Sequence, residues 1–128
     1  MMAADYTRIF VRDYAAALRV GIRPQEKQAP QTIIINVECE AAEALRFDDL
    51  TDEGLDRAIN YMDVYHFIGN ELTGMGHIPL LETVAELIIG FCFRDRRIAK
   101  VRVRLEKPRL RPDAAGMGIE MYRVRKTQ

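Results

Sequence analysis

Apolar and charged residues alternate with a period of two between positions 98 and 107, as in a strand with one buried face. The two rows are Val101, Val103 and Leu105 against Arg102, Arg104 and Glu106. Lys107 continues the apolar row, so its ammonium would be only partly solvated, and Pro108 cannot donate a backbone hydrogen bond. We expect the strand to end at Pro108, with Lys107 either functional or simply reaching solvent from the strand end.

The N-terminal third of the chain predicts two more strands, joined by a polar loop. Positions 31–41 alternate clearly between apolar and polar residues. Positions 7–22 are apolar at both ends and fit a long, irregular strand, although their three consecutive alanines also suit a helix. Pro24 and Pro30 lie in the loop between these segments, and neither can occupy a central strand. The two segments are expected to pair in antiparallel fashion.

Helical spacing of apolar residues follows in the middle of the chain, after an acidic connection over 42–57. One helix is expected to begin after Asn60, a favourable N-cap residue, and to run to Leu72, before a glycine-rich break. A second amphipathic helix is expected from Leu81 to about Arg94.

A final alternating segment, over 117–124, completes the order ββααββ. Pairs of strands on either side of two helices indicate an α+β fold, with a four-stranded antiparallel sheet and both helices on one face. Such a sheet has two open edges. Pairing with sister subunits, or closure into a barrel, would remove these edges.

Composition and charge fit a single soluble domain over residues 1–128. The chain is 48% hydrophobic and carries 19 basic and 19 acidic residues, so its charge favours neither nucleic acid nor an anionic membrane as a partner. It has no apolar run of about 18 residues and no hydrophobic signal core, and we expect it in the cytoplasm. Cys39 and Cys92 are expected to be buried free thiols in a reducing compartment. His66 and His77 lack the spacing of a zinc site, so no metal is expected.

Three carboxylates and one phenol occupy positions from which they could act on a ligand. Glu26 lies in the N-terminal loop, and Glu120 lies within the last strand. Glu82 and Tyr61 lie at the starts of the two helices, and the helix dipole favours an acid there. Each residue alone fits an ordinary structural position as well as a functional one, since most acids are exposed.

Five short motifs in a fixed order change this picture. They are Val20-Gly21-Ile22 followed by Glu26 and Gln31, Ile59-Asn60-Tyr61-Met62-Asp63-Val64, Leu80-Leu81-Glu82-Thr83-Val84-Ala85-Glu86, Val101-Arg102-Val103 running to Lys107-Pro108, and Gly118-Ile119-Glu120. Together they resemble the dihydroneopterin aldolase family of folate biosynthesis over almost the whole chain, from Ile9 to Arg123. The resemblance implies the tunnelling fold, in which four subunits join their sheets into one β-barrel and two such rings commonly stack into a homo-octamer.

The same resemblance implies active sites between neighbouring subunits and gives roles to five residues. Lys107 and Glu26 match the family's catalytic lysine and glutamate. Glu82 matches the residue that holds the 2-amino and N3–H edge of the pterin, and Leu81 matches its neighbour, whose backbone helps to hold the ring. Tyr61 matches a tyrosine that the adjacent subunit contributes to catalysis and binding.

The implied reaction is a retro-aldol cleavage of 7,8-dihydroneopterin into 6-hydroxymethyl-7,8-dihydropterin and glycolaldehyde. The C=N5 bond of the pterin accepts the electrons, so the family needs no metal, Schiff base or other cofactor. A non-catalytic pterin-binding oligomer on the same scaffold would keep Glu82 and could dispense with Lys107 and Glu26, and the chain has all three.

The chain departs from the family pattern around two of these positions. Arg23 and Gln25 stand where the family often has aromatic residues, and Arg109 follows Lys107-Pro108 in place of the usual glycine. If Arg23, Arg109 and Arg111 lie near the open side of the pocket, they would favour a phosphorylated side chain. That arrangement would point to the related dihydroneopterin triphosphate 2′-epimerase.

Overall fold

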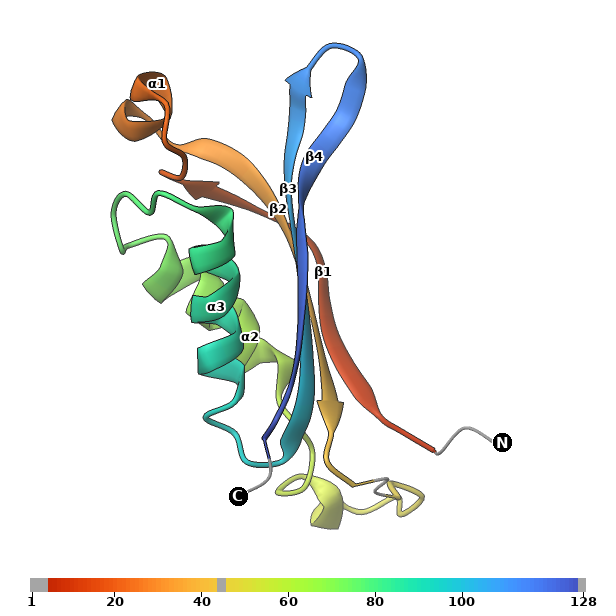
Figure 1. Ribbon diagram of the computed structural model, residues 1–128. Coiled ribbons are helices and arrows are strands. Elements are labelled where there is room, and N and C mark those ends of the chain that lie inside the picture. The colour runs from red at the N-terminus through yellow and green to blue at the C-terminus, as the bar shows by residue number, and fades with distance from the viewer. Residues whose placement is uncertain (1–4, 44–45, 127–128) are drawn as a thin grey trace.

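The computed structural model describes residues 5–43 and 46–126, which form a four-stranded antiparallel sheet with helices packed on one face (Figure 1). The strands are β1 (Arg8–Leu18), β2 (Gln31–Ala41), β3 (Ile98–Arg111) and β4 (Ala114–Val124). They lie in the order β1-β2-β3-β4, and each neighbouring pair is antiparallel. The expected α+β architecture is therefore confirmed.

The alternating apolar rows of β2 and β3 form the floor of the core. Val37 lies opposite Val103 and Ile35 opposite Leu105, and all four side chains are buried against the helices. The polar rows of the same strands face away from the helices, as the period of two requires. Burial of one face sets the register, because a slip by one residue would expose the whole apolar row.

The alanine-rich segment belongs to β1, so a helix at this position is ruled out. Ala16 and Leu18 are buried, so the core-facing row of β1 contains a small residue followed by a larger apolar one. The register of β1 against β2 shifts between Val11 and Tyr14, where Asp13 has a positive φ of 55°. Asn36 of β2 accepts a hydrogen bond from the Asp13 amide at 2.9 Å and stabilises this irregularity. The expected irregular strand thus contains a defined bulge.

Two helical segments cover the sheet. The first is α2 (Tyr61–His66), which continues as a π-helical turn, η2 (Phe67–Leu72), and the second is α3 (Leu81–Cys92). A short 3₁₀ turn, η1 (Asp52–Gly54), precedes them. α3 ends at Cys92, two residues before the expected end at Arg94. None of the described helices is long and apolar enough to cross a membrane.

Cys39 on β2 and Cys92 at the end of α3 are both free and buried, as expected. A hydrogen bond with Cys92, together with burial, raises the pKa of the Cys39 thiol above its ordinary value. The Cys39 thiol is therefore uncharged and packs beside Cys92 between sheet and helix.

Two local expectations were wrong. β3 does not end at Pro108 but continues to Arg111, and β4 begins at Ala114, three residues earlier than expected. Pro108 is accommodated because the register of the hairpin shifts just beyond it, where Arg109 has a positive φ of 52°. The Pro24-containing loop also forms one short helix, α1 (Pro24–Gln28), since proline suits the first turn of a helix.

The close approach of β3 and β4 generates a first prediction. A Cβ atom at Gly118 would overlap the backbone carbonyl oxygen of Leu105, which cannot move aside as a flexible side chain could. We expect Gly118→Ala to lower the free energy of unfolding by about 2 kcal/mol, as overpacking does.

Gly90 in α3 is the matched control, because nothing lies within 4 Å of the position of its Cβ. Gly90→Ala should raise the free energy of unfolding by about 0.5–1 kcal/mol through helix propensity. Urea unfolding followed by circular dichroism measures both changes. Equal denaturation midpoints for Gly118→Ala and the unsubstituted protein would contradict the packing argument.

Candidate active site

A hollow of about 250 Å³ is lined by residues of the N-terminal loop, the start of α3 and β3. Figure 1 shows that these segments approach one another at the end of the sheet that carries α1. The lining of the hollow comprises Val20, Gly21, Ile22, Arg23, Glu26, Pro79, Leu80, Leu81, Glu82 and Lys107. Four of the five residues that the family resemblance singles out therefore border one space, although they come from three separate parts of the chain.

The strongest contact in this hollow is an ion pair between Lys107 and Glu26. The Lys107 Nζ atom lies 2.6 Å from Glu26 Oε2, and the two side chains are only 14% and 10% exposed. Glu26 also accepts hydrogen bonds from the Gln31 side chain at 3.2 Å and from the Arg23 amide at 3.3 Å. These contacts, above all that with Lys107, lower the pKa of Glu26 to about 2. Glu26 is therefore ionised at neutral pH and can only accept hydrogen bonds.

The loop that carries Glu26 is fastened to the segment before α3. Gly21 has a φ of 132°, and a Cβ there would overlap the Glu26 side chain, so only glycine fits. The Gly21 amide donates to the Ile78 carbonyl at 3.2 Å, and its carbonyl lies 2.8 Å from His77 Nε2. Gln31 donates a further hydrogen bond to the Val20 carbonyl at 2.6 Å. These bonds hold Glu26 within reach of Lys107.

Glu82 lies in the first turn of α3, with an exposed side chain on the rim of the hollow. The amides at a helix start have no acceptor within the helix, so Leu81 and Glu82 offer N–H donors beside the carboxylate. A carboxylate next to amide donors suits a planar ligand with adjacent N–H and C=O groups. The hollow thus combines an exposed helix-start carboxylate with a Lys–Glu pair that could move protons.

Tyr61 does not line this hollow. It is the first residue of α2, and its side chain is 56% exposed in the single chain. The expected contribution of Tyr61 to the site of an adjacent subunit stays a prediction.

Of the three arginines expected near the open side of the pocket, the chain itself brings only Arg23 to the hollow. Arg109 and Arg111 are exposed in the hairpin beyond Lys107, outside the residues that line it. Arg111 Nη1 donates to the neighbouring Leu110 carbonyl at 3.1 Å.

A second hollow of similar size, about 260 Å³, lies on the strands and includes Glu120 in its lining. The Glu120 carboxylate pairs there with Arg102 at 3.0 Å and lies 3.9 Å from Arg104. The Glu120 carboxylate is thus engaged in surface ion pairs and lies outside the hollow that holds Lys107.

Gly21 and Gln31 belong to the first of the five sequence motifs, which did not indicate that they hold Glu26 in place, and His77 lies outside all five. His77 lacks a partner at metal-ligand spacing, and its hydrogen bond to the Gly21 carbonyl joins positions 56 residues apart. The only sequence signal for the positive φ of Gly21 was its position between an apolar segment and a polar loop.

The α+β sheet thus carries a half-buried Lys–Glu pair and a helix-start carboxylate around one hollow. A sequence model of the dihydroneopterin aldolase (FolB) family matches residues 9–122, so the chain belongs to that family. No curated protein matches the chain.

Two solved structures illustrate the similarity of fold. Dihydroneopterin aldolase of Escherichia coli in complex with neopterin has a TM-score of 0.74 and 20% identity, covering 91% of this chain and 98% of that one. Dihydroneopterin aldolase of Burkholderia thailandensis bound to guanine has a TM-score of 0.72 and 25% identity, covering 95% and 93%.

The ion pair generates a second prediction, on the dependence of stability on pH. The pKa of Glu26 is lower in the folded protein than the ordinary value of 4.5, so its stabilising effect is complete above that value. It is lost as the pH falls from 4.5 to about 2. We expect the difference in unfolding free energy between wild type and Glu26→Gln to shrink by an amount on the order of 2 kcal/mol over this interval.

Urea unfolding at several pH values measures this difference. Lys107→Met serves as the control, because it removes the principal cause of the low pKa and should flatten the same pH dependence. A difference between wild type and Glu26→Gln that stays constant down to pH 2 would refute the assignment.

Proposed function

We propose that the protein is an aldehyde-lyase that cleaves 7,8-dihydroneopterin into 6-hydroxymethyl-7,8-dihydropterin and glycolaldehyde, without a metal or other cofactor. The observation that carries the proposal is the shared hollow, in which Glu82 and the Lys107–Glu26 pair border one space of about 250 Å³. Membership of the dihydroneopterin aldolase family supports the same reaction.

Glu82 is assigned to substrate recognition. Its carboxylate would accept two parallel hydrogen bonds from the 2-amino group and N3–H of the pterin, while the backbone at Leu81 holds the ring. Neopterin and guanine, which are bound in two similar structures, share this amino-pyrimidinone edge. A ligand anchored at Glu82 would share the hollow with Lys107, within which its side chain would have to reach the ammonium.

Lys107, Glu26 and Tyr61 are assigned to the chemistry. A base removes the proton of the C2′ hydroxyl, the C1′–C2′ bond breaks, and its electrons move into the C6=N5 system of the pterin. Glycolaldehyde leaves, and protonation of C1′ completes the hydroxymethyl product. Lys107 and Tyr61 carry these protons, through a water where the distance is long. Glu26 tunes Lys107 and orients that water.

Completion of the site requires a second copy of the chain. The sheet has two outer strands, β1 and β4, whose edges have no partner among the described residues. We propose that these edges join in a homo-tetrameric barrel, or in a homo-octamer of two rings, so that Tyr61 of one subunit completes the site of the next. The enzyme would act in the cytoplasm, within folate biosynthesis.

One observation favours a second reaction, 2′-epimerisation of dihydroneopterin or its triphosphate. Arg23 borders the hollow beside Glu26 and could pair with a phosphorylated side chain. Rejoining the two fragments with opposite stereochemistry at C2′ would use the same proton-transfer groups. A catalytically silent pterin-binding oligomer would need Glu82 alone, so the half-buried Lys107–Glu26 pair favours an enzyme.

The third prediction tests the two ends of the hollow separately. Purified protein incubated with 7,8-dihydroneopterin should release glycolaldehyde, measured by chromatography together with the pterin product. Lys107→Ala should lower kcat by at least about 100-fold while retaining pterin affinity, since it removes a proton-transfer group. Glu82→Ala should weaken neopterin binding by about 100-fold, because two charge-assisted hydrogen bonds are lost.

Glu86→Ala is the matched control for Glu82→Ala. Glu86 lies one turn further along α3 and pairs with Arg123 on the surface at 2.8 Å. This variant should keep both affinity and turnover. Release of glycolaldehyde no faster than without enzyme would refute the aldolase, and unchanged neopterin binding by Glu82→Ala would refute the anchor.

The fourth prediction concerns phosphorylated substrates. If the protein is an epimerase, the wild type should convert dihydroneopterin triphosphate into its 2′-epimer faster than it cleaves it. Arg23→Ala should then raise KM for the triphosphate about 10-fold, because a charged partner of the phosphate is lost. Arg111→Ala is the control and should leave that KM unchanged. Equal use of both substrates by the wild type and by Arg23→Ala would exclude a phosphate-binding role for Arg23.

A further inference from the structure

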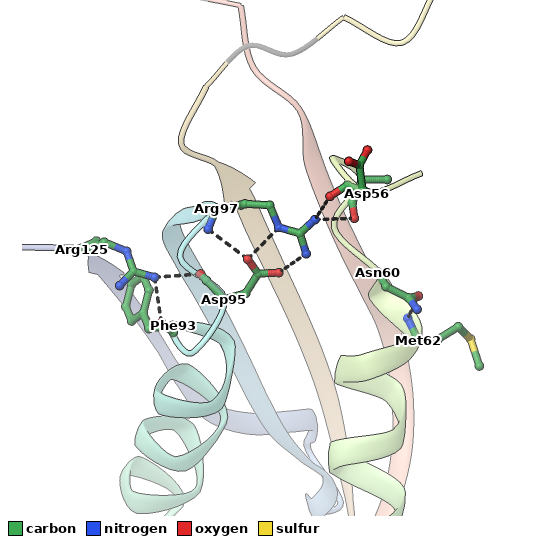
Figure 2. A network of polar contacts seen from close by, with 8 residues as sticks. Asp56, Asn60, Met62, Phe93, Asp95, Arg97 and Arg125 are labelled. Carbon is green, nitrogen blue, oxygen red and sulfur yellow. Dashed lines mark hydrogen bonds and ion pairs between the residues drawn. The ribbon is translucent and has the colours of Figure 1, made fainter. Parts of the chain in front are cut away.

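A cluster of polar contacts lies in the turn between α3 and β3, at the end of α3 opposite the hollow (Figure 2). The Arg97 guanidinium binds both carboxylate oxygens of Asp95, with Nε donating to Oδ1 at 2.9 Å and Nη2 to Oδ2 at 2.7 Å. The Arg97 amide also donates to Asp95 Oδ1 at 3.0 Å. This fork fixes the plane of the guanidinium, because arginine and carboxylate match in geometry. One nitrogen, Nη1, remains free to bind elsewhere.

Arg97 uses this nitrogen to hold a distant stretch of backbone. Nη1 donates to the Asp56 carbonyl at 2.9 Å and to the Ala58 carbonyl at 3.0 Å. Figure 2 shows Arg97 reaching from the turn to Asp56. These carbonyls precede Arg97 by 41 and 39 residues. The segment 56–58 is a connection outside any helix or strand, so the arginine supplies contacts that regular structure does not.

The clamped segment leads directly into the start of α2. Two residues beyond Ala58, the Asn60 side chain accepts a hydrogen bond from the Met62 amide at 2.9 Å, and its carbonyl accepts one from the Asp63 amide at 3.1 Å. Tyr61 lies between Asn60, which accepts both bonds, and Met62. Because Tyr61 is 56% exposed in the single chain, the backbone on either side decides where its ring is held.

We propose that Arg97 is the positioning residue for Tyr61. Held by Asp95, Arg97 fixes the approach to α2 and so sets the place from which Tyr61 enters the site of the adjacent subunit. This inference rests on the proposed function, in which Tyr61 takes part in proton transfer. A lysine at position 97 could bind Asp95 or the two carbonyls, but it lacks the planar fork that joins all three.

Arg125 provides a matched comparison in the same cluster. It donates to the carbonyls of Phe93, Asp95 and Ile98 at 2.8–2.9 Å and lies over the Phe93 ring at 4.8 Å. These contacts join the chain just after β4 to the turn and to the start of β3, and none of them involves the segment 56–58. Loss of Arg125 should therefore loosen the turn without releasing the segment that leads to Tyr61.

The test is a mutant cycle in the assembled enzyme, with 7,8-dihydroneopterin as substrate. Tyr61→Phe should lower kcat about 100-fold, as loss of a proton-transfer group does. Arg97→Ala and Arg97→Lys should each lower kcat about 10-fold with KM unchanged, because misplaced groups lose rate rather than affinity. Added to Tyr61→Phe, either substitution should change kcat by less than about twofold, since both act through one group. Arg125→Ala should keep the wild-type kcat.

Amide hydrogen exchange gives a readout that does not depend on turnover. Exchange of the Met62 and Asp63 amides should be at least about 10-fold faster in Arg97→Lys than in wild type, and unchanged in Arg125→Ala. Equal exchange at these amides, or an equal loss of kcat from Arg97→Ala with and without Tyr61→Phe, would overturn the positioning role. A wild type that releases no glycolaldehyde contradicts the proposed function and with it this inference. An active wild type whose Arg97 variants keep full kcat contradicts the inference alone.

Discussion

The ion pair between Lys107 and Glu26 is the contact on which the site depends, because it joins the N-terminal loop to the far end of β3 across 81 residues. A half-buried ion pair is costly unless further hydrogen bonds compensate for lost water. Here Gln31 and the Arg23 amide supply those bonds to Glu26. Gly21 makes the arrangement possible, since no side chain would fit beside the glutamate. The loop, the short helix α1 and the strand end therefore form one unit.

This unit explains why recognition and chemistry lie together. The segment before α3 is bonded to the same loop through Gly21 and His77, so the start of α3 and its Glu82 are held beside the ion pair. The other end of α3 leads into the turn of Arg97, which clamps the approach to α2. α3 thus runs from the hollow that contains Glu82 to the turn of Arg97, which holds the segment before Tyr61. In the proposed function, Glu82 serves the site of its own subunit and Tyr61 serves the site of the adjacent subunit.

The sequence predicted the regular elements well where one face is buried. Alternation identified β2 and most of β3, and helical spacing identified α2 and α3, because burial imposes a period on each. It did not predict the continuation of β3 past Pro108 or the helix α1. The continuation of β3 depends on pairing with β4, and α1 depends on Pro24 in its first turn and on the Glu26 carboxylate, which accepts a hydrogen bond from the Arg23 amide. Neither the alternation of apolar residues nor their helical spacing reports these contacts.

The site itself could be predicted only through the family resemblance. Neither the alternation around Lys107 nor the loop around Glu26 indicates that their side chains meet, since each fits a solvent-exposed position equally well. Three arginines at or near positions where the chain departs from the family pattern were candidates for the open side of the pocket, but only Arg23 borders the hollow, while Arg109 and Arg111 are exposed in the hairpin. Arg97 gave no signal in the sequence, because the distant partners that it holds are backbone carbonyls, which any residue could provide.

The central claim is that one hollow holds the pterin, with recognition at Glu82 and chemistry at Lys107. The most direct measurement is a crystal structure of the protein with neopterin. We expect the amino-pyrimidinone edge of the pterin to lie within hydrogen-bond distance of the Glu82 carboxylate, and the hydroxylated side chain to lie toward Lys107. Neopterin bound elsewhere, such as on the strand surface beside Glu120, or turned so that its ring edge faces Lys107, would contradict the account.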